Sequence, residues 1–164
     1  PKYPIHNFGI SKLFFEKIIS KSHSNSIIFR LTNVFGSGQH RNMTTIQNWV
    51  ESGNLGEDIV VWGKGSRKLQ YVFIDDVVEI LLKTNQINPG IYNLGSNEYK
   101  TTQTIAKFLG DVFSVRVIND YEKPEGMELP FLNNQRLLET IPSFSFKSVE
   151  NGIKEYVEGL SRAE

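Results

Sequence analysis

The sequence contains no cysteine among its 164 residues. This excludes a disulfide framework, a thiolate metal site and a cysteine nucleophile. An excess of charge of one sign is also missing, because eighteen basic residues balance eighteen acidic ones. A chain without net charge has no overall field that would steer it to nucleic acid or to an anionic membrane. We therefore expect no nucleic-acid partner.

Two further absences concern metals and membranes. The three histidines, His6, His23 and His40, are too scattered to form a metal-ligand pattern. No window approaches the roughly twenty apolar residues of a membrane-spanning helix, and the N-terminus lacks the apolar stretch of a signal peptide. We therefore expect no metal, no membrane association and a cytoplasmic location.

What the sequence does contain is typical of a globular protein, with 39% hydrophobic and 22% charged residues. Its length suits one domain with a single core. Strand-like and helix-like patterns alternate along the chain, which predicts a mostly parallel α/β arrangement. The chain starts at Pro1 and enters a helical pattern almost at once, which suggests a fragment or a processed piece of a longer protein.

Hydrophobic periodicity locates the expected elements. We expect helices at 8–22, 44–52, 75–83, 101–113 and 148–160. Runs rich in β-branched and aromatic residues predict strands at 26–31, 59–62, 70–74, 91–94 and 115–118. The first of these strands is expected to be buried. Loops are expected at 32–38, which is rich in glycine, and at 122–130, which holds two prolines.

The first expected helix has a wide apolar side. Asn7 is the expected N-cap, because a short polar side chain accepts a hydrogen bond from the first turn. A wide apolar side indicates packing on more than one surface, or against a partner subunit. The apolar residues are Leu13, Phe14, Phe15, Ile18 and Ile19.

Four motifs follow one another along the chain. They are Phe8-Gly9-Ile10-Ser11-Lys12 with Glu16, then 30–36, then 63–77, which opens with Gly63-Lys64-Gly65-Ser66, and finally 90–95. Their order and spacing resemble the extended short-chain dehydrogenase/reductases, in the branch of NAD-dependent nucleotide-sugar epimerases and dehydratases. The resemblance extends from Pro4 to about Tyr156.

This resemblance implies a partial Rossmann-like α/β fold, the end of a doubly wound parallel sheet, with a smaller α/β substrate-binding portion. Residues 1–164 would form a single unit like the carboxy-terminal part of the family, with the amino-terminal NAD-binding half absent. Neither Gly36-x-Gly38 nor Gly63-x-Gly65 carries the third glycine of a dinucleotide fingerprint. NAD or NADP is implied for an intact family member, and we expect none to bind this chain alone.

The resemblance also assigns the lysine at the start of the first helix. In the family, the lysine that Lys12 matches binds the nicotinamide ribose and lowers the pKa of a tyrosine one turn earlier, which exchanges a proton with the substrate. Phe8 stands in the tyrosine position and has no hydroxyl. Tyr3 and Ser11 lack the i, i+4 spacing to Lys12 that a substitute would need. For Lys12, the alternative is an ordinary solvated lysine on a helix. For Phe8, we favour a position in the hydrophobic core.

Three further residues are candidates for binding the substrate. Asn33 matches a loop asparagine that contacts the substrate diphosphate in the family, and an ordinary turn asparagine is the alternative. Leu69 stands where the family commonly has an arginine that clamps phosphate or ribose. Arg67 or Lys68 would serve from a shifted position, unless they form a plain solvated charge pair.

Two residue pairs have structural interpretations that we favour over functional ones. Asp75 and Asp76 follow a strand, and we expect them to cap the next helix rather than act as a catalytic dyad. Trp49 and Trp62 are expected in the core, although either ring would stack on a sugar or a base.

The function that the resemblance implies is binding of a nucleotide sugar, with hydride transfer between sugar and NAD in an intact family member. Without the tyrosine and the fingerprint, we expect no turnover by the isolated chain. One alternative is a catalytically disabled homologue with a binding, regulatory or assembly role, and another is a ligand-free fragment that pairs subunits. We also expect a homodimer through the first helix. The sequence does not determine which sugar and base are bound, or whether an intact protein would be an isomerase, a lyase or an oxidoreductase.

Overall fold

The computed structural model describes Pro4 and residues 6–38 and 44–161. Tyr3 and His40 lie outside these residues. The helices are α1 (Asn7–Ser22), α2 (Thr45–Asn54), α3 (Ile74–Leu82), α4 (Thr102–Phe113), α5 (Gln135–Leu138) and α6 (Val149–Ser161), with a short 3-10 turn at Thr84–Gln86. The strands are β1 (Ile27–Leu31), β2 (Asn33–Phe35), β3 (Ile59–Trp62), β4 (Lys68–Phe73), β5 (Gly90–Leu94), β6 (Tyr99–Thr101) and β7 (Val117–Asp120).

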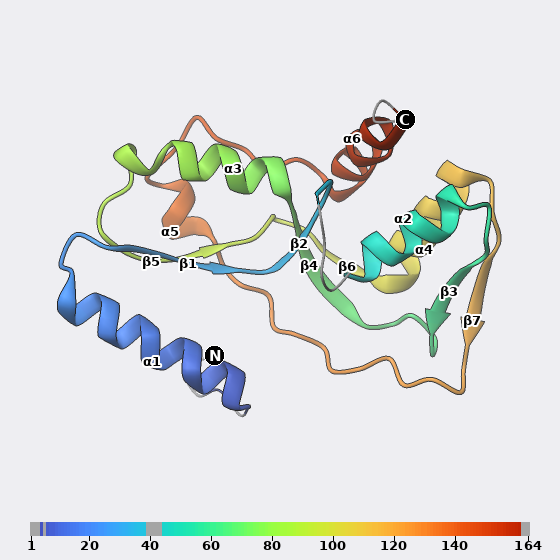
Figure 1. Ribbon diagram of the computed structural model, residues 1–164, viewed down its shortest axis with the longest axis horizontal. Helices are drawn as coiled ribbons and strands as arrows, with labels where there is room; N and C mark the ends of the chain where they lie inside the picture. The colour runs from blue at the N-terminus through green and yellow to red at the C-terminus, as the bar shows by residue number, and fades with distance from the viewer. Residues whose placement is uncertain (1–3, 5, 39–43, 162–164) are drawn as a thin grey trace.

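The strand pairing is mostly parallel, as the alternating pattern predicts. β1 pairs with β5, β2 pairs with β4, and β3 pairs with β7, all in parallel, while β4 and β6 are antiparallel. Only Thr32 separates β1 from β2, so one nearly continuous stretch pairs first with β5 and then with β4 (Figure 1). This arrangement confirms the partial doubly wound α/β fold.

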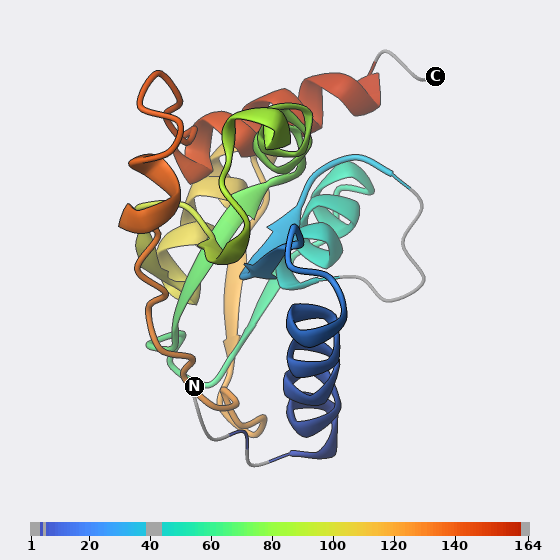
Figure 2. The same ribbon diagram turned by 90° about the vertical axis from the view of Figure 1, so that its left-hand side faces the viewer.

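Hydrophobic side chains on the two faces of β4 belong to two different clusters. Val72 packs with α3, β5 and α5 on one face, whereas Leu69, Tyr71 and Phe73 pack with α2, α4 and α6 on the other. The alternation of side chains along a strand places neighbouring residues on opposite faces. Figure 2 shows α3 and α6 together along one edge of the molecule, above the strands.

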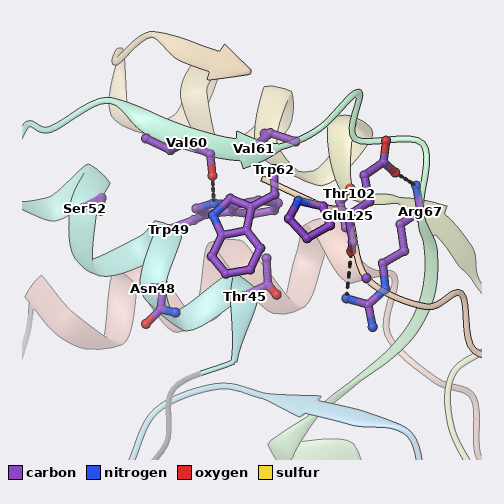
Figure 3. A pocket seen from close by; sticks show the side chains of 12 residues that line it. Thr45, Asn48, Trp49, Ser52, Val60, Val61, Trp62, Arg67, Thr102 and Glu125 are labelled. Carbon is purple, nitrogen blue, oxygen red and sulfur yellow. Dashed lines mark hydrogen bonds between the residues drawn. The ribbon is translucent and has the colours of Figure 1, made fainter. Parts of the chain in front are cut away.

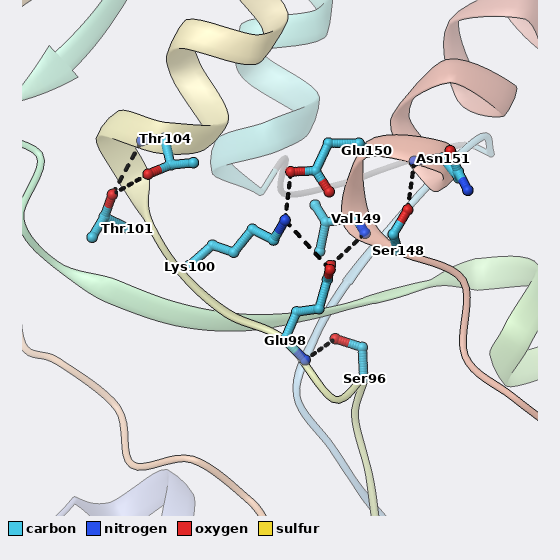
Figure 4. Close-up of polar contacts among 9 residues, drawn as sticks. All are labelled: Ser96, Glu98, Lys100, Thr101, Thr104, Ser148, Val149, Glu150 and Asn151. Carbon is cyan, nitrogen blue, oxygen red and sulfur yellow. Dashed lines mark hydrogen bonds and ion pairs between the residues drawn. The ribbon is translucent and has the colours of Figure 1, made fainter.

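A small polar cluster attaches the amino end of α6 to β6 and the loop before it (Figure 4). Glu98 Oε2 accepts a hydrogen bond from the backbone N–H of Val149 at 2.7 Å. Lys100 forms ion pairs with Glu98 and Glu150. A carboxylate at a helix N-terminus satisfies an N–H group that has no partner within the helix. This cluster therefore fixes where α6 begins.

Helix α1 lies apart from the rest of the molecule (Figure 1) and buries none of its residues. A two-point contact between Arg30 on β1 and Glu16 holds it, with distances of 2.9 and 2.7 Å. The expectation that Phe8 lies in the core is wrong, because the side chain is 73% exposed. The N-cap is His6 rather than Asn7, and no side chain caps this end of the helix.

Two other expectations about the elements are corrected, and two further elements were not expected. The strand expected at 26–31 is only half-buried, because β5 is the one strand that pairs with β1 among the described residues. Part of the expected loop at 32–38 is strand β2, which pairs with β4. β6 and α5 were not expected, since each is too short to show a periodicity.

Within the described part of the chain, no helix is long and apolar enough to cross a membrane.

Candidate functional site

Two pockets lie beside the strands, and a single segment, 124–132, contributes to the wall of each. The first, which we call the Trp62 pocket, has a volume of about 370 Å³ (Figure 3). It is lined by Thr45, Asn48, Trp49, Ser52, Val60, Val61, Trp62, Arg67, Thr102, Pro124, Glu125 and Gly126. The second, the Asn33 pocket, has a volume of about 260 Å³ and is lined by Leu31, Thr32, Asn33, Gln70, Leu129, Pro130 and Leu132.

The pleat of β3 divides its side chains between a buried face and an exposed face. Ile59 and Val61 are buried in the core, whereas Val60 and Trp62 point to the other face. The expectation that Trp62 lies in the core is therefore wrong, because its ring is 54% exposed and Lys123 Nζ lies 5.2 Å from the ring centroid. Trp49 is buried as expected, and its Nε1 donates to the carbonyl of Val60 at 2.8 Å.

Glu125 closes the turn that joins β3 to β4. Its carboxylate accepts hydrogen bonds from the backbone N–H of Lys64 at 2.8 Å and of Arg67 at 2.7 Å, and from the Ser66 hydroxyl at 2.9 Å. Desolvation acts to raise the pKa of Glu125, but these hydrogen bonds outweigh it and lower the pKa below its ordinary value. The N–H groups around Gly63-x-Gly65 are thus bound to a carboxylate and do not form a phosphate cradle.

Arg67 lines the Trp62 pocket and bonds the backbone of the 124–132 segment. Its Nε donates to the carbonyl of Met127 at 2.8 Å, and its Nη1 lies 3.4 Å from the carbonyl of Glu125. Met127 separates the part of the 124–132 segment that lines the Trp62 pocket from the part that lines the Asn33 pocket. Lys68, the other basic candidate, is exposed at the start of β4 and lines neither pocket.

Asn33 and Gln70 meet at the floor of the Asn33 pocket. Asn33 Nδ2 donates to the backbone carbonyl of Gln70 at 2.9 Å. Gln70, which is 3% exposed, donates from Nε2 to the carbonyls of Ser96 and Leu132 and accepts at Oε1 from the N–H of Leu132 at 2.9 Å. One buried amide therefore holds the 124–132 segment against β4.

Lys12 is placed away from both pockets. Its Nζ lies 5.2 Å from the centroid of the Phe8 ring, one helical turn earlier, so the predicted i, i+4 neighbourhood is confirmed. Phe8 contributes a ring face to this contact and has no proton to exchange. The turn around Gly63-x-Gly65 does not fit the pyrophosphate of NAD, because N–H groups of this turn already bind the Glu125 carboxylate.

Asp75 and Asp76 lie in the first turn of α3, where the expectation placed them, but neither side chain caps the helix. Asp76 is buried, and its Oδ2 accepts from the backbone N–H of Lys147 at 3.0 Å. Burial raises the pKa of Asp76, and this effect outweighs the bond from Lys147, which lowers it. Asp76 therefore fastens the segment before α6.

Among the described residues, no group of acidic and histidine side chains is arranged to hold a metal ion.

The parallel strands, their flanking helices and the pockets beside them define a Rossmann-like α/β protein. The chain belongs to the NAD dependent epimerase/dehydratase family, which it matches over residues 1–95. This confirms the resemblance drawn from the four motifs.

Several solved structures share this fold. UDP-glucose 4-epimerase from Thermotoga maritima, crystallised with UDP-glucose, is 21% identical with a TM-score of 0.82, and the match covers 98% of this chain and 55% of that one. UDP-glucuronic acid 4-epimerase from Bacillus cereus, in complex with UDP-glucuronic acid and NAD, is 16% identical with a TM-score of 0.79, covering 99% and 55%.

GDP-L-fucose synthetase from Naegleria fowleri is 24% identical with a TM-score of 0.68, and the match covers 91% of this chain and 50% of that one. The chain therefore spans about half the length of these enzymes, and the identities are those of a shared fold.

Sequence reasoning missed Gln70, Glu125 and the 124–132 segment as parts of the site. The segment has no hydrophobic periodicity, and its prolines indicated only a loop. Its role depends on contacts with residues more than fifty positions away in the sequence, such as Ser66 and Gln70, which no local pattern reveals.

Proposed function

We propose that this chain is the substrate-binding portion of an NAD-dependent nucleotide-sugar epimerase/dehydratase-like protein, and that it binds a nucleotide sugar without turning it over. The observation that carries this proposal is the 124–132 segment, which lines both pockets. Neither pocket reaches far beyond the roughly 300 Å³ at the low end for small-molecule sites. Each pocket is therefore large enough for one part of a nucleotide sugar.

The two pockets suit the two ends of such a ligand. The exposed face of Trp62 offers a planar apolar surface on which a base stacks. The Asn33 pocket would take the sugar, with Asn33 on the side of the diphosphate. Gly126 lines one pocket and Leu129 the other, and three residues span at most about 11 Å. Arg67 lies against this short connection, where its guanidinium would bind a diphosphate.

Titration calorimetry tests this binding. The uridine, thymidine, guanosine and cytidine diphosphates and their glucose conjugates would be titrated into the purified chain. We expect at least one base to bind, and Trp62→Ala to weaken that binding about tenfold through loss of stacking. Leu82→Ala, at an exposed apolar residue of α3 that lines neither pocket, is the control and should leave affinity unchanged. No binding of any of these nucleotides would contradict the proposal.

A second candidate function is that of a catalytically disabled homologue with a binding, regulatory or assembly role. Phe8 favours it, since the ring next to Lys12 has no hydroxyl. The Phe8→Tyr variant of the full-length protein separates the two. Activity gained with the tyrosine supports a site complete but for one oxygen, whereas ligand binding without activity supports the binding role.

We further propose that the chain forms a homodimer through α1. Its large apolar side chains stay exposed, including Phe14 and Ile18, and an exposed apolar helix face of this kind commonly marks an interface. Light scattering should give twice the monomer mass. Phe14→Glu with Ile18→Glu should give the monomer mass, because each charge occurs twice across a two-fold interface. Leu82→Glu, at an exposed apolar residue of α3, is the control and should stay dimeric.

A further inference from the structure

The Asn33 pocket differs from an ordinary sugar site in having few unused polar groups. Four of its seven lining residues are apolar, namely Leu31, Leu129, Pro130 and Leu132. Leu31 and Leu129 are 50% and 43% exposed, so a ligand in the pocket would cover apolar surface that now faces water. Burial of such surface favours an apolar ligand group.

The polar groups of the pocket are largely occupied within the protein. The side-chain amide of Gln70 is bonded on both its nitrogen and its oxygen, to Ser96 and Leu132. Asn33 has given one N–H to the carbonyl of Gln70, which leaves its Oδ1 and one N–H for a ligand. Thr32 Oγ1 is buried and makes no hydrogen bond with the described residues.

A hexose presents hydroxyls in several directions around its ring, and the pocket offers partners for few of them. A hydroxyl that loses water without gaining a partner costs binding free energy, whereas a methyl group against leucine and proline gains it. The pocket is therefore matched to a sugar that is polar on the side facing Asn33 and apolar on the side facing the 124–132 segment.

Leu129, Pro130 and Leu132 form the apolar wall of the Asn33 pocket. Hydrogen bonds hold this wall in place, which selection between ligands requires. Gln70 bonds both the N–H and the carbonyl of Leu132. At the other side, the Tyr99 hydroxyl donates to the carbonyl of Leu129 and its ring packs edge-on to Phe131 at 5.9 Å. A wall fixed at both ends cannot turn its backbone polar groups toward a ligand hydroxyl without breaking these bonds.

From these contacts we propose that the Asn33 pocket selects nucleotide sugars whose sugar carries a methyl group, either in place of a hydroxymethyl group, as in a 6-deoxyhexose, or within an N-acetyl group. This inference rests on the proposed function, because the nucleotide brings the sugar to the pocket. Leu129 and Pro130 are the residues that would contact the methyl group.

Calorimetry with matched ligands tests the inference. The probes are the uridine, thymidine, guanosine and cytidine diphosphates, each alone, with galactose or 6-deoxygalactose, and with glucose or N-acetylglucosamine. With whichever base binds, we expect the methyl-bearing member of at least one pair to bind about tenfold more tightly, as a methyl-sized difference in an apolar pocket allows. Equal affinity within both pairs, or tighter binding of both fully hydroxylated members, overturns the inference.

A matched pair of variants locates the preference in the wall. Leu129→Asn places an amide in the Asn33 pocket at a partly exposed position, so folding should be retained, and it should reduce the preference to less than about threefold. Met127→Asn makes the same change on the same segment at a side chain that lines neither pocket and should leave the preference intact. A preference that survives Leu129→Asn overturns the inference.

The free nucleoside diphosphates separate this result from the proposed function. If a diphosphate binds but the sugar pairs do not differ, selection by the Asn33 pocket is wrong and nucleotide binding stands. If no diphosphate and no conjugate binds, the proposed function fails and this inference fails with it.

Discussion

Asp76 shows how a single residue departs from the role that its position suggests. A carboxylate in the first turn of a helix usually stabilises that turn through the helix dipole. Here the side chain is buried and accepts the N–H of Lys147 from a distant part of the chain. Because burial raises its pKa in the folded state, its ionisation opposes folding.

The sign of the resulting pH dependence follows from proton binding. Between the ordinary pKa of about 3.9 and the raised folded value, the folded state holds more protons than the unfolded state, so the free energy of unfolding falls as pH rises. Asp76→Asn removes this fall and keeps an oxygen acceptor for Lys147. We expect chemical denaturation to show the variant gaining stability relative to the native chain as pH rises through that window.

A second variant separates titration from hydrogen bonding. Asp76→Ala leaves the N–H of Lys147 without a partner and should lower the free energy of unfolding by about 1–3 kcal/mol relative to Asp76→Asn at every pH. If the asparagine and alanine variants were equally stable, the bond to Lys147 would contribute nothing.

At the scale of elements, α6 packs on the core through a glycine. A Cβ atom at Gly152 would lie 2.9 Å from Phe35 Cζ and 3.1 Å from Phe73 Cβ, and both rings belong to the buried cluster. Gly152→Val should therefore lower the free energy of unfolding by about 1–3 kcal/mol through overpacking, as measured by urea denaturation.

The same helix supplies the control. Gly159 has no heavy atom within 4 Å of the position its Cβ would take. Gly159→Ala should raise the free energy of unfolding by about 0.5–1 kcal/mol, because alanine restricts the unfolded chain and favours the helix. A loss of stability in both variants would mean that the helix tolerates no Cβ at either position, which would contradict the packing explanation.

At the scale of the whole molecule, the helix that matches the family's catalytic helix does not contribute to either pocket among the described residues. Lys12 and Phe8 lie on α1, which contacts the rest of the molecule mainly through Glu16 and Arg30, and they line neither pocket. We expect the purified chain to show no NAD-dependent epimerisation or dehydration of nucleotide sugars above the rate without protein. Product formation followed by chromatography would reveal turnover, and any turnover that scales with protein concentration would refute this expectation.

The sequence by itself determined the family and most of the elements. The four motifs gave the assignment that the family match bears out, and β3 was predicted with the bounds that it has, because a short apolar run between turn residues is a local signal. Arg67 and Asn33 were predicted as binding residues, and each lines a pocket. Their contact with a ligand stays a prediction.

Only the tertiary structure decided which side chains are exposed and which segments meet. Hydrophobic character alone placed Phe8 and Trp62 in the core, yet both are exposed, since burial depends on what packs against a residue rather than on its own polarity. Gln70 and Glu125 appeared as ordinary polar residues, and they matter because each binds backbone groups about sixty positions away in the sequence. Such long-range pairing has no local signal, so the wall shared by the two pockets is visible only in the folded chain.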